Sequence, residues 1–479
     1  MYYRLIIHSI GNILILLALT MFFPVIWSVK DRSSDLAPLL LSIAITLIVG
    51  FLMRQVKPEG KFGRREGFAI VGFGWILIVA FGALPLFLSG SAPSFTDAYF
   101  EIMSGFTTTG ATVISDVESL DRGILFWRSL THWIGGMGII VLSLAVFALF
   151  GGGASMFRAE VPSLVPEKIM PRLKQTAMAL WGIYTVISLI QVITLKLAGL
   201  SFFDSLIYTF GSMGTGGFSS RNISVEAYRS VPIEMVLVLF MTLAGINFSL
   251  YYRAVQRRSL KAIVTDPEAR GYLTILIGAT FLVTGSLVIS MKLPVLRALR
   301  YAVFQVVSIS TTTGFSSADF SLWPPFAQAI LMILMFIGAS AGSTGGGLKV
   351  ARLLLLFKYM AKQIKRVARP RLMIQTKLGE THIQDSVVHE ILAFFFIYVL
   401  LFVLGGMVLA ATGLDLISAF SASVAALSNI GPGLARVGPL SNYSLLSPVA
   451  KWTMSFLMLA GRLEIFTILV MFSGSFWKR

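Results

Sequence analysis

Four short strings of small polar residues, each ending in glycine, recur along the chain. They are Thr107–Gly110, Gly214–Gly217, Thr311–Gly314 and Ser428–Gly431. Glycine permits a backbone with positive φ or a close approach of neighbouring strands, and threonine adds a hydroxyl on a stiff side chain. Converging strings of this kind present rings of carbonyl oxygens, which can replace the hydration shell of a monovalent cation. The predicted ligands are the last three residues of each string: Thr108, Thr109, Gly110, Thr215, Gly216, Gly217, Thr312, Thr313, Gly314, Asn429, Ile430 and Gly431.

A single string of this type is better explained by ordinary packing, because small residues are common where membrane helices contact one another. The final glycines, however, lie 107, 97 and 117 residues apart, by subtraction of their positions. That period accommodates two membrane-spanning helices with a re-entrant segment between them. The recurrence favours four units around one ion pore over four independent packing motifs.

The composition places the chain among integral membrane proteins, since 56% of its residues are apolar and 13% are charged. Its apolar stretches are long enough for helical spans, unlike the short alternating segments of a membrane β-barrel. The net charge of +17 is typical of basic cytoplasmic loops and does not indicate nucleic-acid binding. Because the chain has no cysteine, disulfides, cysteine-ligated metals and thiol catalysis are excluded.

Hydropathy predicts an all-α protein embedded in membrane lipid, with ten spans and four re-entrant segments. The spans are expected at 5–27, 37–53, 68–89, 124–149, 177–198, 232–252, 271–292, 326–357, 389–412 and 449–473, and the re-entrant segments at 97–109, 204–217, 300–314 and 416–431. The chain then divides into two leading helices with a basic loop and four pseudo-symmetric helix–pore-loop–helix repeats around one pore. These units are 1–67, 68–176, 177–270, 271–388 and 389–479.

Basic residues cluster between the repeats, and the positive-inside rule places those linkers in the cytoplasm. Both termini are then cytoplasmic, and every re-entrant segment faces outward. The first apolar run lacks a small-residue cleavage site, so we expect it to remain as a membrane helix. Asp97 and Asp204 each precede the final glycine of their string by 13 residues, which supports a common register in the first two repeats.

A run of small residues, Gly338–Gly347, interrupts the second span of the third repeat. Three of its glycines are consecutive, and each costs a helix up to about 1 kcal/mol against alanine. We expect the span to break into two half-helices joined by a loop; the alternative is a packing face of small residues. Lys349 ends the stretch, and whether it faces the cavity or extends toward the cytoplasm stays open. The gate candidates here are Gly342, Ser343, Thr344, Gly345, Gly346, Gly347 and Lys349.

Arg462 is a further gate candidate, near the middle of the last expected span and too deep to reach water easily. Either a carboxylate on another helix neutralises it, or its guanidinium lies in the conduction path and slows cations. Glu464 is two residues on, about 200° around a helix, so it cannot share a face with Arg462 and is expected to pair elsewhere.

Acidic residues also occur within and after the first re-entrant segment. Glu101 is expected to anchor the first re-entrant helix by hydrogen bonding. Asp116, Glu118 and Asp121 either concentrate cations at the outer mouth or form a solvated loop.

Seven stretches match a known family: Ser104–Val113, His132–Gly138, Thr215–Ser219, Ser308–Phe315, Gly342–Lys349, Asn429–Gly433 and Ala460–Arg462. Through them the whole chain resembles the Trk/Ktr/HKT superfamily of potassium transporters, and within it the bacterial TrkH/TrkG branch. The resemblance implies potassium uptake across the bacterial inner membrane, a complete pore in one subunit and a homodimer. It implies regulation by a cytoplasmic TrkA-type subunit that binds NAD or ATP, and a pore obstructed below the filter by the Gly-rich loop and Arg462. Members with serine at the position of Gly110 tend to admit sodium, so glycine there indicates potassium preference.

The alternative function is sodium conduction, or sodium- or proton-coupled transport, by a member of the same superfamily. A membrane enzyme would need paired catalytic groups at membrane depth, and the chain has no His-Glu-x-x-His string and no Walker lysine loop. An alternating-access carrier would show halves of opposite topology, whereas these four repeats share one orientation. Apart from the transported potassium ion, no cofactor is predicted for this chain.

Overall fold

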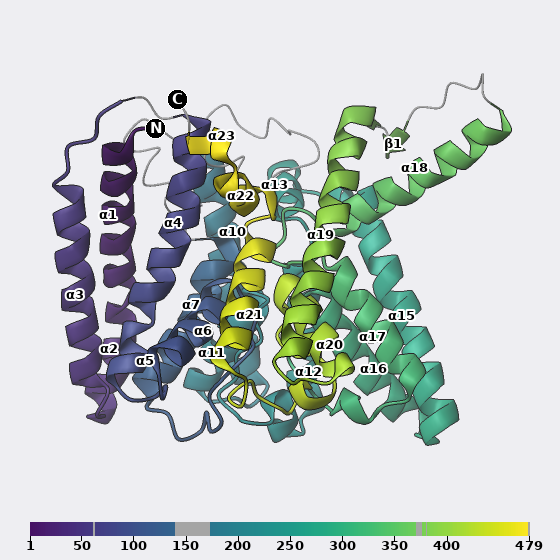
Figure 1. Cartoon of the computed structure of the whole chain (residues 1–479). Coiled ribbons are helices and arrows are strands. Elements are labelled where there is room, and N and C mark those ends of the chain that lie inside the picture. Colours follow the sequence, from purple (N-terminus) through teal and green to yellow (C-terminus); the bar gives the residue numbers. More distant parts are fainter. Residues whose placement is uncertain (61–62, 139–172, 370–375, 380, 478–479) are drawn as a thin grey trace.

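The computed structural model describes residues 1–60, 63–138, 173–369, 376–379 and 381–477. Nearly all elements are helices, most of them running between two opposite ends of the molecule (Figure 1). Both termini lie at one end, together with α13, α22, α23 and β1, and α18 extends obliquely outward at the same end (Figure 1).

By length and composition, six described helices could cross a membrane, or eight if each of two bent helix pairs is counted as one span. Two further spans were expected from the sequence. The first, 124–149, continues past Met137 into residues that lie outside the described part of the chain, and the second, 326–357, is divided by a loop.

The leading helices are α1 (Tyr3–Thr20), which continues as α2 (Phe22–Asp31), and α3 (Leu36–Arg54). Small residues bring α1 and α3 together: a Cβ on Gly11 would lie 2.7 Å from the carbonyl oxygen of Gly50. Next comes α4 (Arg64–Gly82), followed by the short α5 (Leu84–Leu88). The other long helices are α10 (Leu173–Leu197), α15 (Pro267–Met291) and α19 (Asp385–Ala411).

Four short helices precede the four strings: α6 (Phe95–Phe106), α11 (Phe202–Met213), α16 (Val295–Ser310) and α20 (Leu416–Leu427). Three of them begin with a capping side chain. The Oγ atoms of Ser94 and Ser201 accept the backbone N–H groups of Asp97 and Asp204, and each serine hydroxyl also donates to that aspartate's carboxylate. In α20 the two residue types are exchanged, because Asp415 is the cap and Ser418 its partner. Asp97 and Asp204 therefore occupy the same place in their helices, which explains their equal spacing from the glycines.

The helices that follow the strings end or bend sharply. They are α7 (Arg122–Met137), α12 (Val231–Ala244) with α13 (Phe248–Arg257), α17 (Pro325–Ile337) with α18 (Val350–Ala368), and α21 (Pro448–Arg462) with α22 (Phe466–Leu469) and η4 (Val470–Phe472). The bend is 88° between α12 and α13 and 110° between α21 and the segment Phe466–Phe472.

The sequence predicted a break only in the third repeat. The prediction of continuous helices at 232–252 and 449–473 was wrong. In the first of these, Asn247 forms a new N-cap by accepting the backbone N–H of Ser249. In the second, Glu464 and Ile465 adopt positive φ, of 59° and 51°, which ends the helix.

The remaining elements are small. They are α14 (Lys261–Val264), α23 (Gly474–Trp477), η1 (Ser224–Tyr228), η2 (Phe320–Leu322), η3 (Ala435–Val437) and a hairpin of β1 (Thr376–Leu378) and β2 (Thr381–Ile383). The strands are antiparallel with Lys377 opposite His382. The hairpin lies beside α18 and, like that helix, at the end that carries both termini (Figure 1).

Candidate cation site

The four final glycines of the strings form a closed ring. A Cβ built on Gly110 would overlap the carbonyl oxygen of Gly216, and one on Gly217 would overlap that of Thr313. A Cβ on Gly314 would likewise overlap the carbonyl oxygen of Ile430, and one on Gly431 would meet that of Thr109. In each case the oxygen belongs to the residue just before the next string's glycine. The strings therefore follow one another in chain order around a common centre.

The backbone has the same conformation in all four strings. Positive φ occurs at Thr108, Thr215, Thr312 and Asn429 (54°, 53°, 59° and 57°) and again at Gly110, Gly217, Gly314 and Gly431 (84°, 79°, 82° and 97°). Left-handed conformations in non-glycine residues cost of order 1–3 kcal/mol each and persist only where the surrounding structure holds them. Four such residues at matching positions indicate a shared structural requirement.

Backbone hydrogen bonds explain how each short helix ends in this conformation. Thr109 N–H donates to Ser104 O (2.8 Å), and the equivalent bonds are Gly216 to Gly211, Thr313 to Ser308 and Ile430 to Ala425 (2.7, 2.8 and 2.9 Å). This bond spans six residues and, with a left-handed residue before its donor, forms a Schellman-type helix end. Each short helix thus ends at its string, so the partly negative end of its dipole lies next to the ring.

Side-chain hydrogen bonds occur within the strings and between two of them. Within the first string the hydroxyls of Thr107 and Thr109 are 2.8 Å apart, as are those of Thr311 and Thr313 in the third. The side-chain amide of Asn429 donates to Thr109 Oγ1 (3.1 Å) and so joins the fourth string to the first.

The fourth string differs from the others in one respect beyond its residue types. Tyr443 donates its hydroxyl to the carbonyl oxygen of Gly431 (2.6 Å), and its backbone N–H donates to Thr112 O (2.8 Å). A tyrosine 12 residues downstream thus binds the terminal glycine of this string.

A buried ion pair supports the first two strings. Glu101, on α6, accepts the backbone N–H of Val113 (2.8 Å) and the hydroxyl of Thr112 (3.0 Å), as the expected anchoring role requires. It also accepts the guanidinium of Arg128, and both charged side chains are almost fully buried. Arg128 lies 3.6 Å from the ring centroid of Phe218 and donates to Ser219 O (3.2 Å). One pair therefore connects the segments that follow the first and second strings.

Sequence reasoning missed Arg128. An arginine in the middle of an apolar helix was the available signal, because buried charges in membrane proteins are paired. It missed two further pairs for the same reason: Lys451 with Asp97 (2.6 Å), which joins α21 to α6, and Arg300 with Glu234 (2.6 Å), which joins α16 to α12.

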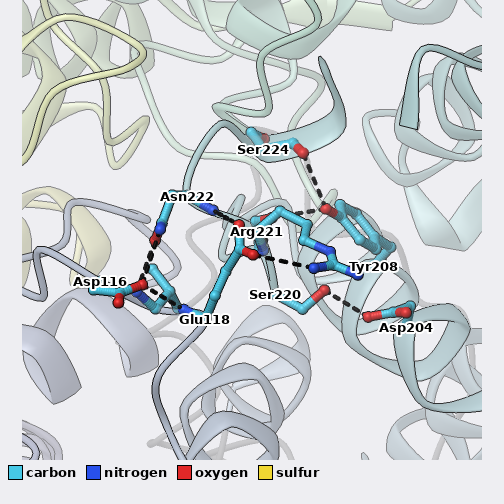
Figure 2. A network of polar contacts seen from close by, with 10 residues as sticks. Asp116, Glu118, Asp204, Tyr208, Ser220, Arg221, Asn222 and Ser224 are labelled. Carbon is cyan, nitrogen blue, oxygen red and sulfur yellow. Dashed lines mark hydrogen bonds and ion pairs between the residues drawn. The ribbon is translucent and has the colours of Figure 1, made fainter. Parts of the chain in front are cut away.

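The acidic residues that follow the first string bind the loop that follows the second string (Figure 2). Asn222 donates its side-chain amide to Asp116 (2.9 Å) and accepts the backbone N–H of Val117 (2.7 Å). Arg221 donates to Glu118 (3.1 Å). The hydrogen bond from Asn222 is the largest of the contacts that lower the pKa of Asp116 below its usual value. Asp116 and Glu118 thus join two loops, a role the sequence did not indicate.

The second loop is in turn fastened to α11 and η1 (Figure 2). Ser220 donates to Asp204 (2.6 Å), and Tyr208 donates its hydroxyl to Ser224 O (3.2 Å). Asp121, the third acidic residue of the first loop, accepts the hydroxyl of Ser34 (2.7 Å).

The Gly-rich stretch forms a loop between α17 and α18, as the sequence predicted. Its tip lies against the strings: Gly346 N–H donates to Thr312 Oγ1 (2.8 Å), and a Cβ on Gly346 would overlap Ser428 O. Thr344 donates its hydroxyl to Ala244 O (3.3 Å). Gly338–Gly342 also has the Gly-x-Ser-x-Gly spacing of a hydrolase nucleophile elbow, but it follows a helix, whereas that motif requires a strand before the turn.

Arg462 is the last residue of α21 and reaches the loop. It donates to Thr344 O (2.8 Å) and to the carbonyl oxygens of Gly135 and Gly136 at the end of α7. Lys349 is buried, and its ammonium donates back to Gly345 O within its own loop. Glu464 pairs with Arg352 of α18 (2.5 Å), in agreement with its expected structural role.

The fold and the site together define a helical membrane protein of the transport class, with a ring of backbone oxygens and glycines at its centre. A family model described as a cation transport protein, TrkH, matches residues 38–479. The chain belongs to the TrkH family, which is a family of transporters and not of enzymes.

Individual relatives extend this similarity over the whole chain. The chain is 38% identical over 483 residues to the Trk system potassium uptake protein TrkH of Halomonas elongata, with 99% of each chain covered. It is 37% identical over 486 residues to the protein of that name in Escherichia coli, with full coverage of both. The fold matches the crystal structure of the potassium transporter TrkH from Vibrio parahaemolyticus with a TM-score of 0.91, at 35% identity and full coverage of both chains.

Proposed function

We propose that this protein takes up potassium across the bacterial inner membrane through a channel-like pore, with the four strings as its selectivity filter. The observation that carries the proposal is the closed ring in which each final glycine approaches the carbonyl oxygen before the next one. The ion is the transported substrate, coordinated by the last three residues of each string. Four helix–pore-loop–helix repeats, preceded by two leading helices, surround the pore.

A monovalent cation such as potassium suits this site, because carbonyl oxygens can substitute for its hydration shell. The helix dipoles of α6, α11, α16 and α20 add negative potential at the centre of the ring, which favours a cation over an anion. The relatives in the curated comparisons are named as potassium uptake proteins, which supports the same substrate here.

The loop 338–349 and Arg462 form the gate in this proposal. The contact of Gly346 with Thr312 connects the loop to the third string, and that of Arg462 with Thr344 connects the arginine to the loop, which supports this assignment. A fixed guanidinium in that position repels a cation that leaves the filter.

The proposal includes an orientation and partners. The positive-inside rule places both termini in the cytoplasm. The relatives are named as parts of a Trk system, which supports a partner subunit for this chain. In the proposal that partner is a cytoplasmic nucleotide-binding subunit of the TrkA type, and this chain forms a homodimer.

A second candidate, sodium conduction, is favoured by the fourth string. Tyr443 binds the carbonyl oxygen of Gly431, and isoleucine and proline flank that glycine. Unequal quadrants weaken the match to one ion size, so we expect potassium preference with a modest sodium leak.

Growth of a bacterial strain that lacks potassium uptake systems tests the proposal. Expression of this chain is expected to restore growth at low potassium, with weak inhibition by added sodium. A matched strain carrying Gly278→Ser, at a helical glycine with open space around it, serves as the control for expression. No rescue with normal membrane expression would contradict potassium uptake, and sodium influx measured in those cells would then favour the second candidate.

A further inference from the structure

The neck of the loop 338–349 is closed by its own backbone. Leu348 N–H donates to Phe336 O and Val350 N–H donates to Ala339 O, both at 3.0 Å. The segments before and after the middle of the loop, called its two limbs, therefore run side by side. A compact Ω-type loop likewise has its ends close together. The tip cannot move far from the strings unless these limbs shift.

One carboxylate outside the loop binds both limbs. Glu268, the second residue of α15, accepts the backbone N–H of Ala341 (2.6 Å) and that of Ala351 (3.1 Å) on the same oxygen, Oε1. Ala341 lies in the first limb. Ala351 lies in the first turn of α18, where backbone N–H groups have no partner within the helix. The Glu268 side chain is buried, with 8% of its surface exposed.

We propose that Glu268 is a positioning residue that fastens the two limbs of the loop and so sets the balance between the observed loop position and a displaced one. Both hydrogen bonds to this one oxygen must break before the two limbs can leave it. The N-terminus of α18 favours an acceptor at this point, because its first backbone N–H groups lack partners within the helix. The consequence for transport rests on the proposed function, in which this loop obstructs the pore.

The start of α15 is itself fastened to the linker before it. Asp266 caps the helix by accepting the N–H groups of Glu268 (3.0 Å) and Ala269 (2.9 Å), and Arg270 donates to Val264 O (2.9 Å) in α14. A displacement of the linker 261–266 therefore carries Glu268 with it. This arrangement gives a force applied at the cytoplasmic linker a direct route to the loop.

Because the chain has no cysteine, a single Ser343→Cys substitution provides a reporter at a half-buried position of the loop. The full-length protein would be purified in detergent, and the rate of thiol modification measured with and without Glu268→Ala. We expect Glu268→Ala to raise the rate about tenfold, which corresponds to ~1.4 kcal/mol. Glu268→Gln retains a neutral acceptor and is expected to raise it about threefold.

Potassium flux in proteoliposomes, measured without the reporter substitution, should rise in the same order, from wild type through Glu268→Gln to Glu268→Ala. Glu390→Ala, at an exposed glutamate of α19, is the matched control and is expected to leave both readouts unchanged. If the reporter rates of both Glu268 variants stay within twofold of wild type, the positioning role is wrong.

The two proposals fail in different ways. A wild-type protein without potassium flux would contradict the proposed function, while the reporter rates would still test the fastening of the limbs. If Glu268→Ala does not yield folded protein, as judged by size-exclusion chromatography, the threefold change expected for Glu268→Gln decides the matter alone.

Discussion

Gly110 approaches Gly216 so closely that a single methyl group on Gly110 would overlap the Gly216 carbonyl oxygen. The positive φ of Gly110, 84°, is also a conformation that other residues rarely adopt. Space and backbone conformation thus both favour glycine here. The same holds at Gly217, Gly314 and Gly431, so the ring depends on glycine at four separate places in the chain.

Replacement of Gly110 by serine is the first test of the ring. The added side chain must displace the Gly216 carbonyl, which the proposal assigns to cation coordination. We expect the potassium-to-sodium permeability ratio to fall about tenfold, the factor that ~1.4 kcal/mol represents. Reversal potentials in planar bilayers would measure it, with Gly278→Ser as the control. An unchanged ratio would remove Gly110 from the filter.

Arg462→Ala tests the gate. The substitution removes a positive charge and the hydrogen bonds that tie the loop to the end of α7. We expect potassium flux at matched expression to rise about tenfold, equivalent to a barrier lower by ~1.4 kcal/mol. Arg297→Ala, at an exposed arginine of α16, should leave the flux unchanged. Equal or lower flux in Arg462→Ala would show that Arg462 is not a barrier.

The pair Glu101–Arg128 makes a prediction about stability. Replacing Glu101 alone by leucine leaves a buried guanidinium without its carboxylate partner, which costs about 3–5 kcal/mol in comparable buried pairs. Adding Arg128→Met removes the stranded charge and should restore part of that loss. Thermal unfolding in detergent measures both variants. If the destabilising effects of the two substitutions on thermal unfolding are additive, the ion pair is not the source of the effect.

The outer bridge between Asp116 and Asn222 makes a prediction about pH. Because the pKa of Asp116 is lowered in the folded protein, the carboxylate stabilises the bridge above its unfolded pKa of about 4. That contribution is lost as the pH falls through the lower, folded pKa. Hydrogen exchange of the Val117 amide, which donates to Asn222, should therefore stay slow at neutral pH and lose protection only in strong acid. Loss of protection between pH 6 and pH 5 would contradict this. Asn222→Ala should abolish the protection at every pH.

Local patterns were sufficient to predict the short helices and the broken span of the third repeat. The string residues were recognised because glycine and threonine recur at matching positions, and the loop because three glycines in a row cannot sustain a helix. The bends after Ala244 and Arg462 were missed because each depends on one or two residues with no such composition. Glu464 and Ile465 adopt positive φ, and the Glu464 side chain pairs with Arg352, which is 112 positions away in the chain.

Long-range pairing was the other part that sequence reasoning could not supply. Lys451 and Asp97 are 354 positions apart, and Asn429 and Thr109 are 320 apart, so no local pattern connects them. The sequence identified Glu101 and Arg462 as buried charges, but their partners depend on how the repeats are arranged around the centre. The closure of the ring, from Gly431 back to Thr109, is likewise visible only in three dimensions.

The most direct test of the central claim is the reversal potential of the purified protein in planar bilayers with potassium on one side and sodium on the other. A ring of carbonyl oxygens formed by four glycine-ended strings predicts a large reversal potential with the sign expected for higher potassium permeability. A sodium leak should reduce its size slightly. Gly110→Ser and Gly314→Ser should each move it toward zero. A wild-type potential that follows sodium, or one that neither substitution changes, would contradict the account.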